Sequence, residues 1–334
     1  MELRLRHKFA LARDVEWTME QRLLVVSPLR NEAAHIELVA LALESQTRRP
    51  DLWLVVDDHS SDETPQLLAR LAERLDFMSV IRSQPPASDD APKDRLAIAA
   101  PPRAFNVGLN SADWQAFTHV AKLDGDVELP PRYFELLLGE FARDSTLGLA
   151  GGVLQERDVD GWCKLHASND YHVRGGLKCY TRECLQAIGG IQERLAWDAI
   201  DEIYARMRGY RTRTVSELVA RHHRPTASAD GILRGRARHG QCAYILHFTL
   251  PWVTLRAFKV ARERPRGLSG FAFLYGYLRS PVFRVAQVDD REFRTFVRRE
   301  LRARVRGELA RRKKQTRSTV RRIDERLREA SRGV

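Results

Sequence analysis

Short apolar runs alternate, along the first half of the chain, with stretches in which apolar residues recur every three or four positions. The short runs are rich in Val, Leu and Ile, which is typical of strands buried on both faces. They predict strands at residues 23–27, 52–56, 77–81 and 116–123, and further strands at 147–154, 176–180 and 218–220. Strands that alternate with helices indicate an α/β fold with a mostly parallel central sheet and flanking helices.

Capping and helix-breaking residues mark where the helices between these strands begin and end. Asn31 caps the first helix, and Ser60 with Glu63 has the spacing of a capping box. Gly209 ends a later helix. The residues at 83–102 are rich in Pro, Ala and Asp and predict a long loop.

After residue 240 the pattern changes from alternating strands and helices to long helices, predicted at 243–259 and 270–288. This change defines the expected domains. The chain is predicted to have an N-terminal extension, a main α/β domain, a helical subdomain and an arginine-rich helical tail, at 1–20, 21–228, 229–290 and 291–334 respectively.

The charge of the chain is concentrated at its C-terminal end. The 334 residues carry a formal net charge of +12, and 43% of them are apolar, which is enough for a sizeable core and excludes wholesale disorder. Residues 291–334 hold 17 Lys and Arg against 6 Asp and Glu, whereas the rest of the chain is almost balanced. The body is therefore electrically neutral and the tail is cationic.

The cysteines and the apolar segments bear on where the protein works. The four cysteines, Cys163, Cys179, Cys184 and Cys242, form no Cys-x-x-Cys pair, which favours a reduced, cytoplasmic compartment. The N-terminal residues lack the continuous apolar core of a signal peptide. No segment reaches the roughly 18 apolar residues of a spanning helix, so the chain is not expected to cross a membrane by itself.

Acidic residues follow three of the first four predicted strands. Glu32 lies just after the first, Asp57 and Asp58 end the second, and Asp124 and Asp126 follow the fourth. If the strands are adjacent and parallel, these side chains meet at one edge of the sheet, where ligands gather in such folds. Two carboxylates around a glycine suit one hard divalent cation. A single acidic pair is equally well explained as residues that simply end a strand or cap a helix, but three acidic strand ends together favour a ligand-binding site.

The sequence has no glycine-rich phosphate-binding loop after any predicted strand. A phosphorylated ligand would therefore be held by a metal ion and by basic side chains. Arg103, at the start of the helix before the fourth strand, is one candidate, although it is also readily interpreted as a surface arginine.

Two more groups of polar residues follow in the second half of the domain. Asp198 shares a helix face with Asp201 and Glu202, which either complement the helix dipole or supply a general base. His222 and His223 follow a short strand, and because adjacent side chains of a strand point to opposite sides, only one of them can reach a given metal ion.

Five segments, taken in order, resemble the family 2 glycosyltransferases of the GT-A fold. They are SPLRNE, VVDDHSSDET, RAFNVGLN, KLDGDVELPP and WDAIDEIYARMRGY. The resemblance covers about residues 22–225 and extends to a subgroup with GWDxxDE and HHR signatures. It implies a metal-dependent enzyme that transfers a sugar from a nucleotide-sugar donor to a hydroxyl of a glycan or lipid-linked acceptor.

The resemblance also implies roles for particular residues. Pro28, Glu32 and Asp58 would hold the base and ribose of the nucleotide, with Asp57 next to them. Asp124 and Asp126, in a DxD motif, would bind Mn²⁺ or Mg²⁺ on the diphosphate, with His222 or His223 as a third ligand.

The catalytic base is implied to lie among Asp198, Asp201 and Glu202, with a slight preference for Asp201. Family members often carry adjacent Glu-Asp at this point, whereas this chain spreads its acids over five positions. A base opposite the leaving group gives transfer with inversion.

Two other functions use similar features. A nucleotidyltransferase has acidic strand ends on a similar sheet, but it usually begins with a glycine-rich or basic loop, and PLRNEAAH has no glycine. A basic nucleic-acid-binding protein would explain the tail, but the tail has no interleaved aromatic residues after Phe296, and an acidic site repels a polyanion. No nucleic-acid partner is expected.

The C-terminal helices have two interpretations of equal weight. Aromatic residues between 244 and 277 lie beside Arg256, Lys259, Arg262 and Arg279, and they either pack a helical subdomain or form a surface that contacts anionic lipid. In the tail, Val297, Leu301, Val305 and Leu309 recur every four residues among arginines. The sequence therefore predicts a cytoplasmic enzyme at the inner face of a membrane, in cell-envelope or surface polysaccharide synthesis.

Overall fold

The computed structural model describes residues 21–83, 99–158, 161–164, 170–224, 231–304 and 306. The chain divides into two compact units, one ending at Ala229 and the other beginning at Asp230. The expected N-terminal extension, most of the loop predicted at 83–102, and Val305 and Leu309 of the tail lie outside the described residues.

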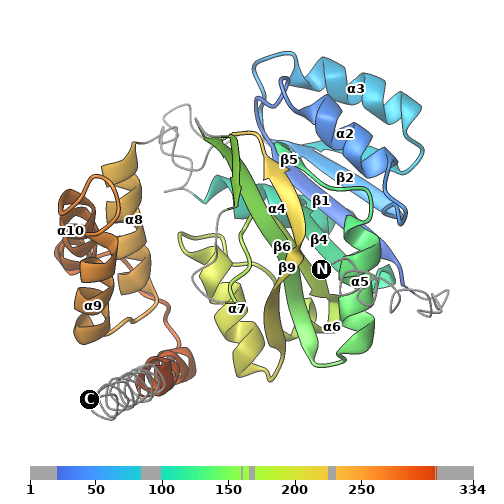
Figure 1. Ribbon diagram of the computed structural model, residues 1–334. Helices are drawn as coiled ribbons and strands as arrows, with labels where there is room; N and C mark the ends of the chain where they lie inside the picture. Colours follow the sequence, from blue (N-terminus) through green and yellow to red (C-terminus); the bar gives the residue numbers. More distant parts are fainter. Residues whose placement is uncertain are drawn as a thin grey trace, which may run out of the picture. The chain divides into compact units, whose positions relative to one another are not determined.

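The first unit is built on one mixed sheet, in which nine strands are described (Figure 1). The strand order is β3-β2-β1-β4-β8-β6-β9-β5, and β7 pairs with β6. The strands are β1 (Leu23–Leu29), β2 (Leu52–Asp57), β3 (Met78–Arg82), β4 (His119–Leu123), β5 (Val127–Glu128), β6 (Leu147–Asp158), β7 (Gly161–Lys164), β8 (Leu177–Thr181) and β9 (Arg211–His222).

The parallel arrangement predicted from the sequence holds for the first four strands in space. β3, β2, β1 and β4 run parallel to one another, and β6 is parallel to β9. β8 lies antiparallel between β4 and β6, while β5 and β7 form antiparallel edges. The antiparallel β8 therefore joins two parallel groups into a single sheet.

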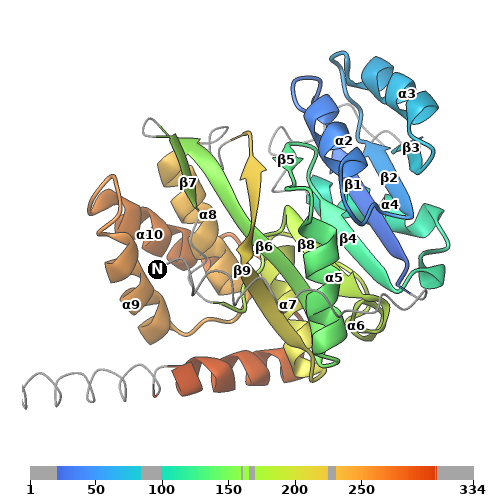
Figure 2. The same cartoon turned by 45° about the vertical axis from the view of Figure 1, so that its right-hand side comes forward.

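Helices cover both faces of this sheet (Figure 2). α2 (Ile36–Glu44), α3 (Thr64–Arg74) and α5 (Tyr133–Arg143) pack on one face. α4 (Ala100–Ser111), the 3₁₀ turn η2 (Trp114–Ala116), α6 (Arg182–Ala187) and α7 (Trp197–Met207) contribute to the other. α4 begins within the predicted loop, since Pro101 and Pro102 fit the first turn of a helix.

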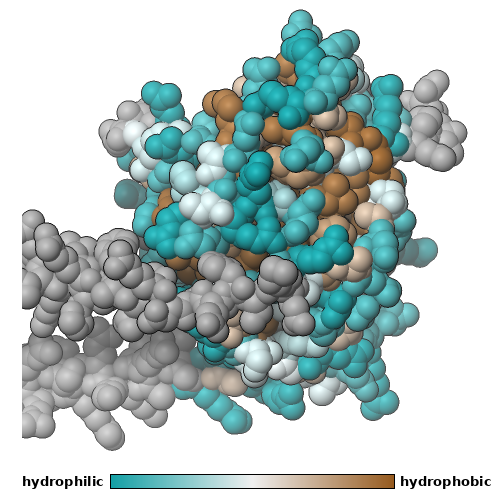
Figure 3. Space-filling model, turned by 90° about the vertical axis from the view of Figure 1, so that its right-hand side faces the viewer, coloured by the Kyte–Doolittle hydropathy of each residue, from teal (hydrophilic) through white to brown (hydrophobic). Residues whose placement is uncertain are grey.

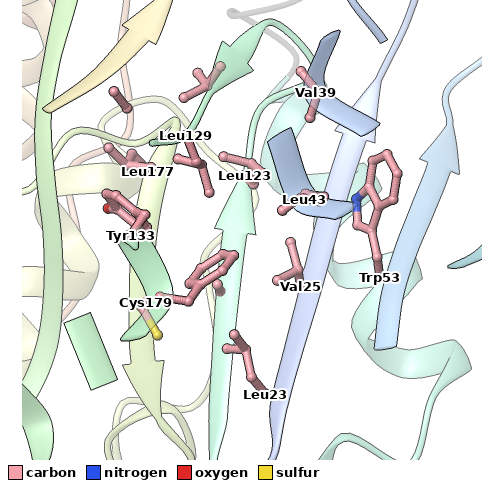
Figure 4. Packing of buried hydrophobic residues seen from close by; sticks show 14 of the residues in the cluster. Leu23, Val25, Val39, Leu43, Trp53, Leu123, Leu129, Tyr133, Leu177 and Cys179 are labelled. Atoms are coloured by element: carbon pink, nitrogen blue, oxygen red, sulfur yellow. The ribbon is translucent and has the colours of Figure 1, made fainter. Parts of the chain in front are cut away.

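The core follows the alternation of side chains along the strands (Figure 4). Leu23 and Val25 of β1 belong to the same buried cluster as Val39 and Leu43 of α2, whereas Leu24 and Val26 belong to the cluster on the opposite face. The indole of Trp53 is fully buried, and its Nε1 donates a hydrogen bond to Ser27 Oγ at 2.9 Å. A strand buried on both faces thus explains each continuous apolar run.

The described part of the second unit contains α8 (Ile232–Ile245), α9 (Leu250–Val260), α10 (Leu268–Val282) and a helix over 291–304. The helix predicted at 243–259 is interrupted. His247 has a positive φ of 58° and Pro251 lies in the first turn of α9, so α8 ends and a new helix starts. Phe273 is buried with Val253 and Val260, whereas Val297 and Leu301 of the last helix are 2% and 3% exposed.

The surface is mixed. On the face drawn in Figure 3, hydrophilic side chains surround an area of hydrophobic ones. Leu38 and Leu41 of α2 are among the large apolar residues exposed on the first unit. Among the described helices, none combines the length and the apolar character needed to cross a bilayer.

Candidate functional site

The carboxyl ends of β1, β2 and β4 meet at one edge of the sheet. β1 lies between β2 and β4 and is parallel to both, with Leu29 opposite Asp57. The backbone amide of Asp58 donates to the Leu29 carbonyl at 2.8 Å, which ties the first two strand ends together. The three acidic segments predicted from the sequence therefore share this edge.

The segment after β1 is held in place by residues before α3. Asn31 has a positive φ of 55°, and its side chain accepts a hydrogen bond from the Ser61 amide at 2.8 Å. The Glu32 amide donates to Thr64 Oγ1 at 2.9 Å. These contacts fix the backbone so that the Glu32 carboxylate, 6% exposed, faces the end of β4.

The two aspartates after β2 have different partners. Asp57 is buried and accepts from the Ser60 amide at 2.9 Å, with Arg82 Nε at 3.7 Å. Asp58 is less buried and accepts from Ser83 Oγ at 2.8 Å. Asp57 therefore shapes the turn, and Asp58 is the one nearer to solvent.

Asp124 and Asp126 lie on either side of the turn after β4. Asp124 accepts a short hydrogen bond from Lys122, whose aliphatic stem is buried in the sheet. A Cβ added to Gly176 would lie 2.5 Å from Asp124 Oδ2, so a larger residue here would displace this carboxylate. Asp126 is 6% exposed. Burial opposes its ionisation, but the hydrogen bond and charge of His222 outweigh burial and lower the pKa of Asp126.

The two adjacent histidines point to different partners, as expected for neighbours on a strand. His222 lies between Asp126 and Glu156, with Nε2 at 3.5 Å from Asp126 Oδ2 and Nδ1 at 2.9 Å from Glu156 Oε1. These carboxylates overcome burial and raise the pKa of His222 to about 9. His223 Nε2 instead contacts Glu128 Oε2 at 2.8 Å. Of the two rings, that of His222 lies beside the Asp126 carboxylate, whereas His223 contacts Asp126 through its backbone amide, which donates to the Asp126 carbonyl at 3.0 Å.

Arg224 belongs to the HHR signature and lies among these acids, although its sequence position alone predicted no role for it. Its Nη2 lies 2.5 Å from Glu32 Oε2, and its Nε lies 3.8 Å from Asp126 Oδ2. Burial and the charge of Asp126 nevertheless raise the pKa of Glu32 to about 7. Arg224 thus joins the end of β9 to the ends of β1 and β4.

The carboxylates of α7 divide into a buried pair and an accessible one. Asp201 and Glu202 are 2% and 3% exposed and lie beside the fully buried Lys178. Lys178 Nζ lies 2.8 and 2.9 Å from the two Asp201 oxygens, and Tyr180 donates to Asp201 Oδ2 at 2.5 Å. Burial outweighs Lys178 and raises the pKa of Asp201. Asp198 is half-buried and has solvent access.

Glu202 has partners of its own. Its Oε1 accepts from the Val173 amide at 2.7 Å, and its Oε2 lies 3.1 Å from His172 Nδ1. Burial opposes ionisation, but the charges of Lys178 and His172 outweigh it and lower the pKa of Glu202. With Asp201 it therefore anchors α7 to the sheet.

The segment at Gly175 and Gly176 connects α7 with the turn after β4. A Cβ on Gly175 would lie 3.3 Å from the Asp198 Cβ, just as one on Gly176 would meet Asp124. Lys122 and Lys178 flank Trp197, at 5.2 and 5.5 Å from its ring. Asp198 and Asp124 consequently lie close to adjacent residues of one short segment. The buried lysines had no recognisable signal in the sequence beyond a charge inside an apolar strand.

The ion pair of Arg103 is with a residue outside the acids at the strand ends and on α7. Its side chain is 53% exposed on α4, and its Nε lies 3.4 Å from Glu193 Oε2. It therefore pairs with the segment before α7.

The donor set suits a hard divalent cation only in part. Carboxylate oxygens of Asp124 and Asp126 and the imidazole of His222 are of the right chemical type. Within the described ranges, no three acidic, His or Cys side chains are grouped closely enough to hold a metal ion alone. Mg²⁺ in phosphate-binding sites commonly takes one or two carboxylates and completes its coordination with substrate phosphates and water. The residues present fit a site of that kind.

Comparison with known proteins identifies the fold of the chain. No protein-family model and no curated protein sequence matches this chain. Among solved structures, the chain is similar to the mannosyltransferase PcManGT from Pyrobaculum calidifontis, in complex with GDP-Man and Mn²⁺. The TM-score is 0.50 and the identity 19%, over 90% of this chain and 81% of that one.

A second solved structure of similar architecture is GalNAc-T7 with UDP, GalNAc and Mn²⁺. The TM-score is again 0.50, with 13% identity over 84% of this chain and 56% of that chain. These likenesses show that the chain has the GT-A fold of glycosyltransferases, as the sequence predicted.

Proposed function

We propose that this protein is a metal-dependent glycosyltransferase related to family 2, in the subgroup with GWDxxDE and HHR signatures. It transfers a sugar from a nucleotide-sugar to a hydroxyl of a glycan or lipid-linked acceptor. The observation that carries the proposal is that a half-buried carboxylate, Asp198, lies close to the same Gly175–Gly176 segment as Asp124. This proximity supports a general base beside a diphosphate-binding turn.

In this proposal the nucleotide lies along the ends of β1 and β2. Pro28, Glu32 and Asp58 contact its base and ribose, and Asp57 keeps the turn in shape through its bond to the Ser60 amide. The hydrogen bonds that fix Glu32 and Asn31 support this role, because a preformed donor site loses little conformational entropy on binding. Arg103 contributes at most from the rim, since it pairs with Glu193.

Asp124 and Asp126 hold the divalent cation, Mn²⁺ or Mg²⁺, together with His222. When bound, the cation supplies Lewis-acid stabilisation of the leaving diphosphate. His222 must lose its proton to become a ligand, and its pKa of about 9 means that cation binding releases this proton at neutral pH. His223 takes no direct part, because it is engaged with Glu128.

Asp198 is the general base. It removes the proton of the acceptor hydroxyl, which then attacks the anomeric carbon on the face opposite the diphosphate, so that transfer inverts the configuration. The raised pKa of Asp201 would also suit a base, but both of its oxygens are occupied and it is shielded from solvent. The preference within the cluster therefore moves from Asp201 to Asp198, with Glu202 and Asp201 as supports.

The protein acts in the cytoplasm at the inner face of a membrane, on an acceptor of cell-envelope or surface polysaccharide synthesis. The excess of 17 basic over 6 acidic residues at 291–334 supports this location, because cationic residues are attracted to anionic lipid headgroups.

The test combines calorimetry with product analysis. The full chain is titrated with UDP-, GDP- and dTDP-sugars in the presence of Mn²⁺, and the donor that binds is then offered with candidate acceptors. Asp126→Asn should abolish cation-dependent binding, whereas the control Asp144→Asn, a carboxylate paired with Arg211 elsewhere in the unit, should bind like the wild type.

Three results would contradict the proposal. Equal binding by Asp126→Asn, or full transfer in excess EDTA, removes the cation from the reaction. Retention of configuration at the anomeric carbon, read by NMR, excludes a single displacement assisted by Asp198.

A further inference from the structure

Helix α10 carries mostly small residues on its buried side and large apolar residues on its exposed side. Ser269, Gly270, Gly276 and Ser280 are buried, and Phe273 is the one large side chain buried with them. On the opposite side, at alternating spacings of three and four, lies what we call the α10 stripe: Leu268, Phe271, Tyr275, Leu278 and Val282, which are 56%, 70%, 49%, 50% and 77% exposed. In a water-soluble helix the large apolar residues normally face the core.

The buried side of α10 lies so close to α8 and α9 that the large side chains of the stripe could not fit there if the helix were rotated about its axis. A Cβ on Gly276 would lie 1.8 Å from the Ala237 carbonyl of α8, and one on Gly240 of α8 would lie 1.9 Å from the Phe273 carbonyl. A Cβ on Gly270 would lie 2.5 Å from the Ala257 carbonyl of α9. Backbones in such close approach through small residues are typical of helices that pack within lipid.

The second unit also holds most of the exposed apolar side chains. Of fifteen large apolar residues exposed in the described part of the chain, eleven lie between Ile232 and Phe283. Leu255 and Phe258 of α9 are 59% and 69% exposed, and Phe283, directly after α10, is 71% exposed. Clusters of this size are uncommon on a surface that faces only water.

The charge around these residues is mostly positive. Between residues 246 and 288 the chain has seven Arg and Lys and a single acid, Glu263, which is paired with Arg236. Arg279 lies beside the stripe, with its guanidinium 5.5 Å from the Tyr275 ring and 5.7 Å from the Phe283 ring. Arg256 and Lys259 are exposed on α9. Exposed apolar side chains interleaved with exposed positive charge complement an anionic lipid surface.

We propose that α9 and α10 form an in-plane membrane-docking face, with the α10 stripe inserted at the boundary between headgroups and acyl chains of an anionic bilayer. The inference deepens the proposed function, on which its choice of a membrane partner rests, and it assigns lipid contact to α10 rather than to the tail stripe, whose Val297 and Leu301 are buried. A second copy docking on this face would bring like charges together, and a nucleic acid would leave the apolar stripe without a partner.

The experiment is flotation of the full chain with vesicles of phosphatidylcholine alone or mixed with phosphatidylglycerol. The test variant is Phe271→Ser with Leu278→Ser. The matched control is Leu38→Ser with Leu41→Ser, a pair of exposed leucines three residues apart on α2. The tail is intact in all three proteins, so a difference between them reports on the stripe.

The wild type and the control should float with the anionic vesicles and retain part of that binding at high salt. The stripe variant should lose about tenfold or more of its partition coefficient, and nearly all binding at high salt, because apolar insertion is not screened by ions. If the stripe variant binds the vesicles as well as the wild type does, the contact belongs to the tail and the proposal is overturned. A change from dimer to monomer in the stripe variant, without vesicle binding by the wild type, would identify the face as a contact between copies and also overturn it.

Calorimetric titration of the same proteins with the nucleotide-sugar separates this inference from the proposed function. The stripe variant should bind the donor like the wild type. Vesicle binding without any donor binding would leave the docking face in place and reject the transferase.

Discussion

Asp198 and Asp201 lie one turn apart on α7, yet their surroundings give them opposite roles. Asp201 neutralises the buried Lys178 and accepts from Tyr180, whereas Asp198 is half-buried and only its backbone carbonyl accepts from Lys178. Removing the charge of Asp201 should disturb the fold, and removing the charge of Asp198 should disturb the reaction.

Asp198→Asn is expected to lower turnover by roughly 10²–10⁴ with the melting temperature and donor affinity unchanged. Asp201→Asn is expected to destabilise the protein by about 3–5 kcal/mol, because a lysine without exposed surface loses its main counter-charge. Turnover and thermal melting of both variants provide the check. If Asp201→Asn retains its stability and loses only turnover, the base is Asp201.

His119, at the start of β4, should make stability depend on pH. It is 6% exposed and packs against the Phe141 ring at 5.0 Å, and burial lowers its pKa to about 4. The unfolded chain takes up this proton near pH 6.5, so the stability contributed by the neutral ring is complete above pH 6.5 and is lost as the pH falls toward 4. Between pH 7 and pH 5 the loss should be about 2 kcal/mol.

His119→Asn removes this titration while keeping a polar atom near Thr118 Oγ1, which lies 2.9 Å from the ring nitrogen. Urea unfolding at pH 7 and pH 5 should therefore show a smaller pH dependence in the variant than in the wild type. Parallel curves for the two proteins would mean that His119 is not the group responsible.

At the scale of elements, the sequence predicted what depends on local patterns. The apolar runs of β1, β2 and β4 are continuous because these strands are buried on both faces, and their order along the chain is enough to predict that they are parallel neighbours. β9 was predicted only at 218–220, yet it runs over Arg211–His222. Its buried residues are separated by exposed ones and by polar residues, so its sequence contains no long continuous apolar run.

For the candidate site, the sequence predicted the meeting of the acidic strand ends at one edge of the sheet. The acids at strand ends are visible in the sequence, since strand order alone brings them together. The buried ion pair of Asp201 with Lys178 was not predictable, because it depends on the antiparallel insertion of β8 between β4 and β6. A lysine in an apolar strand gives no indication of which acid, 23 residues later, neutralises it.

The packing of α10 against α8 predicts a sharp dependence on side-chain size. Gly276→Ala should destabilise the second unit by about 1–3 kcal/mol, because the new methyl would overlap the Ala237 carbonyl. Gly139→Ala, in α5, is the control. Its nearest neighbour would be Arg143 Nη1 at 3.8 Å, so it should stabilise its helix by about 0.5–1 kcal/mol.

Hydrogen exchange of peptides from α8 and α10 measures the first effect, and exchange in α5 measures the second. Faster exchange in α8 and α10 of Gly276→Ala, with none in Gly139→Ala, is the expected pattern. Unchanged exchange in Gly276→Ala would show that the two helices separate easily to admit a methyl group.

At the scale of the molecule, every residue of the candidate site belongs to the first of the two compact units. Donor and Mn²⁺ at about 100 times their dissociation constant should stabilise that unit by about 2.7 kcal/mol, because only the folded state binds them. Hydrogen exchange should slow in β1, β2 and β4 and stay unchanged in α8, α9 and α10. Asp126→Asn should show no slowing at all, since the cation links the nucleotide to the turn after β4. Slowing of equal size in α8–α10 would show that the two units unfold together, and that the binding energy of the site is shared by the whole chain.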